Sequence, residues 1–418
     1  MEKLVCIQKM HTSFYFIKIS ALFFISFNVI ISSILLKGNN YMKKILIFYG
    51  SYGGGHLSAA KSIKQELEEK YSDIEVKMVD CIEYINKYIN KLTTEAYKEL
   101  AKKAPFLWKY VYKDSQKGPL ATISTTSNRL MSHKLNILLQ EFQPDLIVST
   151  HPFGTQMCGI LKKKEKIHCK IATILTDFHI HAQWLVFNEY IDDFFVSNEQ
   201  MKSDMVKCSI PEEKIHVTGI PVSKRFLEDF NKVEICKEFG LDPEKETVLF
   251  FAGGEFGLGR NTTFMTLKAL ERLFSKLQVV AISGKNPKMK KKFEDLVNTT
   301  DSANRIKIIE YTNKVPELMS ISSMVVTKAG GLTITESLTA HLPIIIINPI
   351  PGQEEENAQF LVDNNVAIWI KKDDNIARAL KNLYRHPETI ENMKQNAINL
   401  AKPYSTENIC KILIDSIS

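Results

Sequence analysis

The chain has 418 residues, 44% of them apolar and 24% charged, which is enough for two or three globular domains with full cores. Its formal charge of +7 fits an anionic partner such as a nucleotide or a lipid surface, and is too weak to indicate nucleic-acid binding. The seven cysteines are scattered without a CxxC pair, which excludes a disulfide scaffold and favours a reduced, cytosolic catalytic region.

Residues 1–41 form a hydrophobic N-terminal segment. Within it, residues 14–36 are long and apolar enough to span a bilayer, with Lys18 as the single charged residue. Lysines precede and follow this stretch, so the charges do not fix its orientation, and no small-residue cleavage site follows it. Two interpretations stay open: a membrane anchor, or a start-site error in a chain that truly begins at Met42.

Residues 42–222 alternate between apolar runs and helical patterns. The apolar run at 43–50 ends in glycine and predicts a buried parallel strand, and residues 57–71 follow with helical spacing of apolar side chains. This alternation predicts a doubly wound domain. Its further strands are expected at 74–80, 145–150, 170–177, 192–198 and 214–222, with a helical stretch at 82–113.

Residues 223–403 repeat the same organisation. After a charged helix at 223–239, the run 247–254 predicts a strand and a glycine turn. The last helix, at 404–418, is expected to pack back on the first domain. The fold class is therefore α/β, with two Rossmann-like halves in tandem. The further strands of the second half are expected at 277–284, 305–312, 324–331 and 343–350, with a helix at 332–341.

The first candidate site is the turn Gly53, Gly54, Gly55, His56, between the first strand and its helix. Such glycines let a ligand approach backbone N–H groups, and a helix N-terminus favours negative charge. The turn matches neither a Walker loop nor G-x-G-x-x-G, so it gives little support to dinucleotide binding. Two interpretations remain: His56 caps a tight turn, or it is a base with a pKa near neutrality that takes a proton from an alcohol.

The segment "VVTKAGGLTITES" at 325–337 is a candidate diphosphate site. Lys328 follows a strand, and Gly330 and Gly331 would let the next helix meet phosphates with its N-terminus. Glu336 lies one turn into that helix, where an acidic side chain can hydrogen-bond a ribose diol. The alternative is a plain glycine turn with a surface glutamate.

A second polar loop, "NPIPGQEEENAQFL" at 348–361, gathers Gln353, Glu354 and Asn357 at a helix start. Because a buried sugar hydroxyl without a partner is costly, such side chains suit a hexose. The alternative is an ordinary charged helix N-terminus.

The segment "TDFHIHAQW" at 176–184 raises the question of a metal. Two histidines at i and i+2 point in opposite directions on a strand, and no third ligand cluster accompanies them, so no metal is expected. A loop at a cleft that carries Asp177 and Trp184 toward an acceptor is the preferred interpretation.

Residues 85–118 are rich in lysine with interleaved aromatic side chains. This composition on a helical segment suits an anionic membrane surface. The alternative is a solvated helix whose aromatic residues face the core.

Taken together, these motifs resemble the monogalactosyldiacylglycerol synthase and processive diacylglycerol glucosyltransferase group, which is similar to glycosyltransferase family 28. The resemblance covers residues 43–400. It implies a GT-B fold, in which two Rossmann-like domains face a cleft, the N-terminal one meeting lipid and the C-terminal one holding a UDP-sugar. The motifs are "GSYGGGH", "STHP", "TDFHIHAQW", "VTGIPV", "FAGGEFGLG", "SGKNPKMKKKFE" and "TKAGGLTITESLTAHLP" through "PGQEEENAQFL".

The resemblance further implies inverting transfer of glucose or galactose from a UDP-sugar to diacylglycerol, without a cofactor or catalytic metal. The site would lie at the cytoplasmic face of the cell membrane, with the chain peripheral or anchored by residues 14–36. His56 would be the base, and Gly53, Gly54, Gly55, Asp177 and Trp184 would line the acceptor side. The donor side would comprise Gly254, Lys285, Asn286, Lys328, Gly330, Gly331, Glu336, Gln353, Glu354 and Asn357.

Two departures from the family pattern leave the acceptor details open: Ala329 stands where relatives often carry proline, and Val186 where they often carry a second histidine. Other functions also stay open. They are transfer of N-acetylglucosamine to a polyprenyl-linked cell-wall precursor, UDP-sugar epimerisation, and nucleotide-sugar or lipid binding without catalysis.

Overall fold

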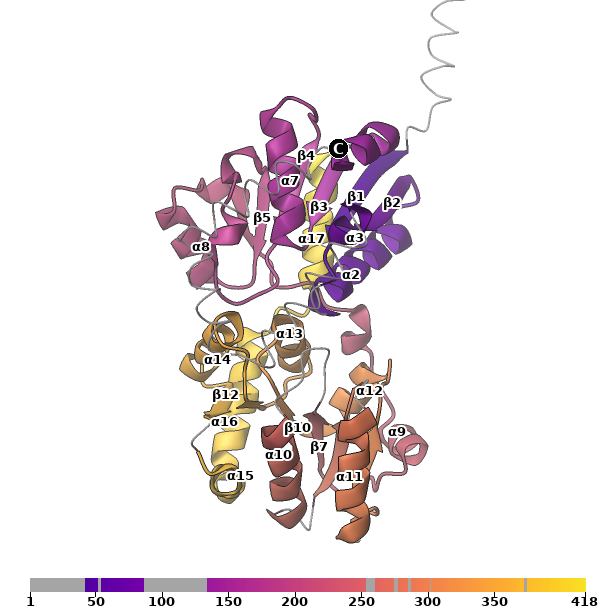
Figure 1. Ribbon diagram of the computed structural model, residues 1–418, viewed down its shortest axis with the longest axis vertical. Helices are drawn as coiled ribbons and strands as arrows, with labels where there is room; N and C mark the ends of the chain where they lie inside the picture. The colour runs from indigo at the N-terminus through magenta and orange to yellow at the C-terminus, as the bar shows by residue number, and fades with distance from the viewer. Residues whose placement is uncertain are drawn as a thin grey trace, which may run out of the picture.

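The computed structural model describes residues 42–51, 54–85, 134–252, 260–273, 277–284, 287–300, 302–371 and 374–418. Two domains, each built on a six-stranded parallel sheet, lie one above the other (Figure 1). The expected membrane segment at 14–36 and nearly all of the lysine-rich segment at 85–118 lie outside these ranges. No helix within them has both the length and the apolarity needed to cross a bilayer.

The upper domain carries a parallel sheet in the order β2-β1-β3-β4-β5-β6. Its strands are β1 Lys43–Tyr49, β2 Ile74–Asp80, β3 Leu146–Ser149, β4 Lys170–Ile174, β5 Asp193–Val196 and β6 Ile215–Val217. Its helices are α2 Gly54–Lys70, α3 Cys81–Ile85, α7 Pro152–Lys163 and α8 Glu199–Lys207, with short 3₁₀ turns η1 Ala182–Trp184, η2 Asn188–Tyr190 and η3 Glu212–Lys214. Residues 134–142 are also helical.

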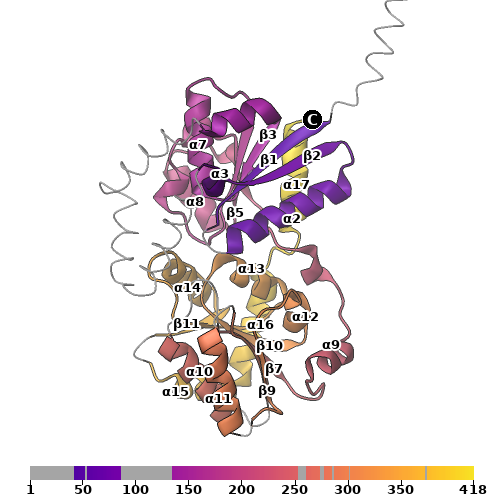
Figure 2. The same ribbon diagram turned by 45° about the vertical axis from the view of Figure 1, so that its right-hand side comes forward.

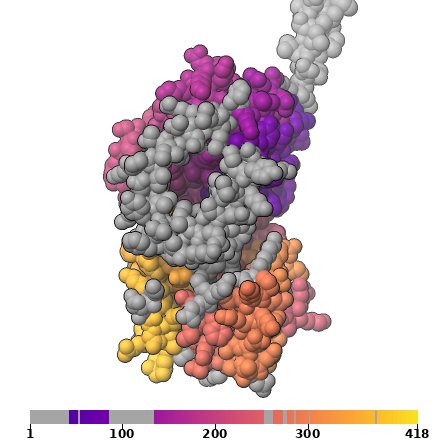
Figure 3. Space-filling view, viewed as in Figure 1, coloured from indigo at the N-terminus to yellow at the C-terminus, as the bar shows by residue number. Residues whose placement is uncertain are grey.

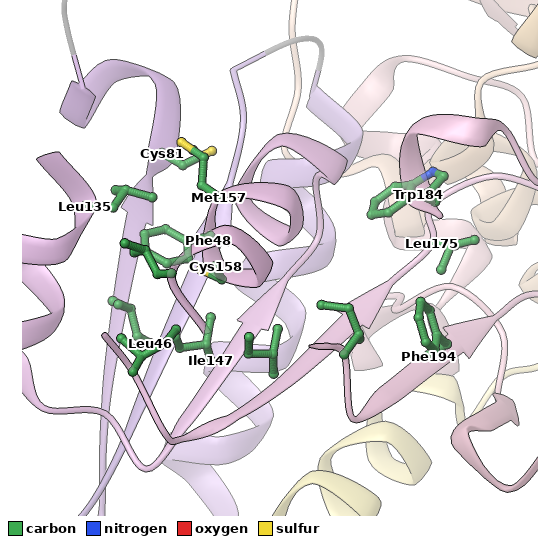
Figure 4. Close-up of a cluster of buried hydrophobic side chains, with 14 of the residues drawn as sticks. Leu46, Phe48, Cys81, Leu135, Ile147, Met157, Cys158, Leu175, Trp184 and Phe194 are labelled. Atoms are coloured by element: carbon green, nitrogen blue, oxygen red, sulfur yellow. The ribbon is translucent and has the colours of Figure 1, made fainter. Parts of the chain in front are cut away.

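Both faces of this sheet are covered, as parallel sheets require. The central residues of β1 are completely buried, and their side chains alternate between two separate hydrophobic cores. One core is shared with α3, α7 and α8, and Figure 4 shows Met157 of α7 near Phe48 of β1. The other core is shared with α2 and with the C-terminal helix α17, Ser405–Ser416.

The lower domain carries a parallel sheet in the order β12-β11-β10-β7-β8-β9, which is the strand order of a Rossmann fold. Its strands are β7 Thr247–Phe251, β8 Gln278–Ile282, β9 Ile306–Ile309, β10 Ser322–Thr327, β11 Ile344–Ile347 and β12 Ala367–Ile370. Its helices are α9 Lys232–Phe239, α10 Arg260–Leu273, α11 Pro287–Thr299, α12 Val315–Ser320, α13 Gly331–Thr339, α14 Gln353–Asp363, α15 Ile376–Arg385 and α16 Pro387–Leu400.

Helices also cover both faces of the lower sheet. Helices α10, α11 and α15 pack on one face, and α9, α12, α13 and α14 pack on the other. In the space-filling view, the yellow C-terminal segment lies at the lower left of this domain and the orange α11 region at the lower right (Figure 3). The resulting molecule has the α/β architecture expected from the sequence, with two doubly wound domains.

Two chain segments cross between the domains side by side. The segment after β6 meets the start of α17, where the Val222 amide donates to Thr406 Oγ1 (3.0 Å) and Thr406 Oγ1 donates to the Val222 carbonyl (2.6 Å). Gly219 has a φ of +91°, and a Cβ placed there would lie 2.6 Å from the Lys402 Cβ, so this crossing requires glycine. From here α17 runs back onto α2.

Two local expectations differ from the structure. The charged segment 223–239 is not one helix: it forms the 3₁₀ turn η4, Lys224–Leu227, and then α9. The break is explained by Asn231, whose side chain accepts hydrogen bonds from the Val233 and Glu234 amides and so begins a new helix. Strand β12 was not expected, because its four residues carry little periodicity.

Removal of a buried side chain from α17 should destabilise the N-terminal domain. Leu413 is fully buried against α2 and the first sheet, so Leu413→Ala should cost about 2–5 kcal/mol and lower the denaturant midpoint of that domain. Lys411→Ala, an exposed position of the same helix, should leave the midpoint unchanged. Equal midpoints for both variants in chemical unfolding would show that α17 contributes no packing energy.

Candidate active site

The candidate site lies where the carboxyl ends of the two sheets face each other. Strand order reverses between β1 and β3 in the upper sheet and between β7 and β10 in the lower one, and ligands of such sheets bind at these switch points. The first turns of α2 and α13 meet here, and a Cβ at Gly55 would lie 3.7 Å from the Leu332 Cβ. Figure 2 shows α2 directly above α13.

His56 lies in the first turn of α2, and the end of β3 fixes its ring. Its Nδ1 is 2.5 Å from the Thr150 carbonyl oxygen, and the Thr150 hydroxyl donates to the His56 carbonyl (2.9 Å). Because a carbonyl can only accept, Nδ1 carries the proton. The Nε2 atom of the neutral ring therefore keeps its lone pair and can accept a proton.

The histidines around this position are held neutral. Burial lowers the pKa of His56 to about 4, opposed by its hydrogen bond to the Thr150 carbonyl. The expected near-neutral pKa of this histidine is therefore wrong, since the surrounding protein disfavours the imidazolium. Burial lowers the pKa of His181 to about 4 as well, and holds that of His151 well below its usual range. The His56 and His151 rings stand edge to face, 4.7 Å apart.

Thr176 touches both the histidine and the opposite domain. Its hydroxyl lies 3.0 Å from His56 Nδ1, and its carbonyl oxygen packs against Gly331 at the start of α13. A Cβ at Gly331 would lie 2.0 Å from that oxygen. Glycine is required here because the two backbones approach too closely for any side chain.

Asp177 joins the N-terminal domain to the first two turns of α14. Its carboxylate accepts hydrogen bonds from Gln353 Nε2 and from Asn357 Nδ2 (3.1 Å). Asp177 is only 3% exposed, and this burial raises the pKa of its carboxyl to about 6, while the hydrogen bonds from Asn357 and Gln353 lower it and the charges of Glu354 and Glu356 raise it. The predicted acceptor residue Asp177 and the predicted donor residues thus contact one another directly.

Lys328 and Glu354 form an ion pair close to this contact. Lys328 Nζ lies 2.5 Å from Glu354 Oε1, and Glu354 Oε2 accepts from the Ile350 amide (2.8 Å). Glu354 is buried and close to Gly330, with 3.7 Å between its Oε1 and a Cβ placed there. Glu354 therefore anchors the loop before α14.

Glu336 lies on α13, past the glycines that begin this helix. Burial raises the pKa of its carboxyl to about 8. Among the described residues, no group donates a hydrogen bond to this carboxyl. The first amides of α13 likewise lack partners within the helix, so this helix N-terminus offers donors and a positive dipole end to an anion.

Other expected residues lie elsewhere. Trp184 is fully buried in the N-terminal core instead of facing a cleft, because its indole packs with the side chains under α7. Gly53, Gly254, Lys285 and Asn286 lie outside the described residues. Within the described ranges, no three or more histidine, cysteine or acidic side chains are grouped so as to hold a metal ion.

Sequence reasoning did not single out Thr150, His151 or Thr176. The sequence did contain information about their position. The motifs "STHP" and "TD" lie at the ends of the third and fourth strands, and the carboxyl ends of parallel strands meet at one edge of the sheet. Small hydroxyl residues next to a strand end give no chemical pattern of their own, so their contact with His56 appears only in the folded chain.

Comparison with known proteins assigns the two halves separately. The family model of monogalactosyldiacylglycerol (MGDG) synthase matches residues 56–222, and that of the glycosyltransferase family 28 C-terminal domain matches residues 248–408. A processive diacylglycerol beta-glucosyltransferase of Staphylococcus epidermidis is 31% identical over 378 residues, covering 90% of this chain and 93% of the relative. The chain belongs to the processive diacylglycerol glucosyltransferase family.

A second member of this family, from Bacillus pumilus, is 29% identical over 90% of this chain and 96% of its own length. Among solved structures, a UDP-GlcNAc 2-epimerase from Neisseria meningitidis superposes with a TM-score of 0.60, at 18% identity and over 89% of this chain and 100% of that one. MurG of Acinetobacter baumannii superposes with a TM-score of 0.60 at 11% identity, over 89% of this chain and 99% of MurG. These structural similarities establish that this member of the family has the GT-B fold.

The contact at Gly331 yields a test of domain closure. Gly331→Ala should force the domains apart, since its Cβ cannot stand 2.0 Å from the Thr176 oxygen, and should raise the radius of gyration measured by small-angle X-ray scattering. Gly54→Ala is the matched control, because a Cβ there meets nothing within 4 Å. An unchanged radius of gyration in Gly331→Ala would show that the closed contact does not persist in solution.

Proposed function

We propose that the protein transfers glucose from UDP-glucose to the free hydroxyl of diacylglycerol, with inversion at the anomeric carbon. The relatives carry this activity in their names, as diacylglycerol beta-glucosyltransferases. The observation that carries the proposal is His56, a neutral histidine of fixed tautomer, set beside the N-terminus of α13 at the meeting of two domains.

His56 acts as the general base. Its Nε2 accepts the proton of the diacylglycerol hydroxyl as the oxygen attacks the anomeric carbon, and Nδ1–H stays bonded to the Thr150 carbonyl. This carbonyl then stabilises the imidazolium that forms. Gly54 and Gly55, directly before His56, carry no side chain, and a Cβ at Gly54 would meet nothing within 4 Å, which lets the acceptor approach the ring.

The amides and dipole of α13 stabilise the leaving diphosphate. Charge develops on the bridging oxygen as the glycosidic bond breaks, and a helix N-terminus aimed at it lowers the barrier. Gly330 and Gly331 let phosphates approach these amides without side-chain hindrance. Glu336, partnerless among the described residues, holds the ribose hydroxyls, and Gln353 faces the hexose. This route uses residues of the chain and the UDP-sugar donor, and calls for no separate cofactor.

The acceptor is a lipid, so the enzyme works at a membrane surface. We place it at the cytoplasmic face, where UDP-sugars are found, either peripheral or held by residues 14–36. The lysine-rich, aromatic segment 85–118 is the proposed contact with anionic lipid.

Replacement of His56 should strongly reduce glucose transfer and leave the affinity for UDP-glucose nearly unchanged. His56→Ala should lower kcat by roughly 10²- to 10⁴-fold, the usual contribution of a general base, with UDP-glucose affinity within about threefold of wild type. Release of UDP in the presence of diacylglycerol vesicles measures turnover, and titration calorimetry measures affinity. His168→Ala, an exposed histidine before β4, is the control. Near-normal turnover in His56→Ala would remove His56 from the mechanism.

The same assay decides the substrates. Labelled UDP-glucose, UDP-galactose and UDP-N-acetylglucosamine, each with and without diacylglycerol, should give glycolipid with UDP-glucose alone. Formation of galactolipid from UDP-galactose would show that UDP-galactose is the donor. Sugar isomerisation without any acceptor would replace the proposal by an epimerase, and transfer only to a polyprenyl-linked acceptor would replace it by a cell-wall precursor enzyme.

A further inference from the structure

We propose that Asp177 of the acceptor domain is a positioning residue for the sugar donor: by bonding Gln353 and Asn357, it completes the hexose subsite of the opposite domain. The proposal rests on the function proposed above. It assigns Asp177 to the donor, whereas its sequence context suggested the acceptor.

The contact is made of direct bonds across the domain junction. Asn357 Nδ2 donates to Asp177 Oδ1 (3.1 Å), Gln353 Nε2 donates to Oδ2, and the Phe178 amide donates to Asn357 Oδ1 (2.9 Å). The Phe178 and Phe360 rings pack beside them, 5.2 Å apart. Two adjacent residues of the upper domain, Asp177 and Phe178, thus contact two successive turns of α14.

The side chain of Asn357 makes all its observed hydrogen bonds within the protein. Its second N–H donates to the Ala329 carbonyl (3.1 Å), in the loop that begins α13, and the residue is completely buried. Both N–H donors and the oxygen are engaged within the protein, and complete burial keeps this side chain out of reach of a sugar. Asn357 therefore joins Asp177 to the glycine loop of the diphosphate site, and does not itself touch the hexose.

Gln353 is oriented by the same carboxylate. A carboxylate accepts only, so the NH₂ side of the Gln353 amide turns to Asp177 and its Oε1 turns away. Among the described residues, no group donates to this Oε1. The oxygen is presented as an acceptor for a hexose hydroxyl, in an orientation that the amide alone would not keep.

Closure of the domains and completion of the donor subsite are then one event. Asp177 is nearly fully buried, so its charge depends on these two amides for partners in the closed form. When the domains part, water replaces both amides, and Gln353 loses the bond that fixes its orientation.

Asp177→Asn tests this, because the shape is kept while an NH₂ group now faces the NH₂ of Gln353. We expect the affinity for UDP-glucose to fall about tenfold and the affinity for UDP, which lacks the hexose, to stay within twofold, both by titration calorimetry. Lys224→Ala, which removes an exposed ion pair with Glu69 at the domain junction, should change neither. Equal losses for UDP and UDP-glucose would overturn the proposal.

The double variant Asp177→Asn with Gln353→Glu supplies the rescue. The new amide at position 177 then donates to the new carboxylate at position 353, which keeps an oxygen toward the hexose, so UDP-glucose affinity should return to within about threefold of wild type. Lack of recovery in a folded double variant overturns the proposal, as does an Asp177→Asn defect confined to KM for diacylglycerol. Failure of the proposed function would appear separately, as absence of glucolipid from the wild type.

Discussion

The structure depends on one close approach, between the Thr176 carbonyl and Gly331. Through it the loop after β4 reaches three features at once: the ring of His56, the start of α13 and the polar side chains of α14. The contact itself joins backbone atoms, while Phe178 next to it packs into the core of the lower domain. Its role is geometric, because it sets the distance between His56, the proposed base, and α13, the helix proposed to bind the diphosphate.

Burial at this junction shifts the pKa values of His56, Asp177 and Glu336 so that each neutral form is favoured. The pKa of His56 falls to about 4, and the pKa values of Asp177 and Glu336 rise to about 6 and 8. These shifts have opposite signs and one cause, which is the cost of a charge removed from water. In such surroundings the dipole of α13 acts on a diphosphate with little screening, so the low polarity that weakens the base strengthens the leaving-group site.

Much of the fold was readable from the sequence, because buried parallel strands such as Ile344–Ile347 are continuous apolar runs bounded by glycine or polar residues. Strand β12 was missed because four residues carry too little pattern. His56 and Gly331 stood out through local motifs. The pairing of Asp177 with Gln353 and Asn357 could not be read, since these residues are about 180 positions apart and meet only when the two domains close.

A histidine with a pKa of about 4 is a weak base, and the structure indicates how the proposed route overcomes this. In that route a diphosphate would bring negative charge to the start of α13, where Gly331 contacts Thr176 and Thr176 contacts His56. An opposite charge nearby raises the pKa of a histidine, and the effect is large where water is excluded. In the proposed route, His56 would therefore gain basicity when the donor binds.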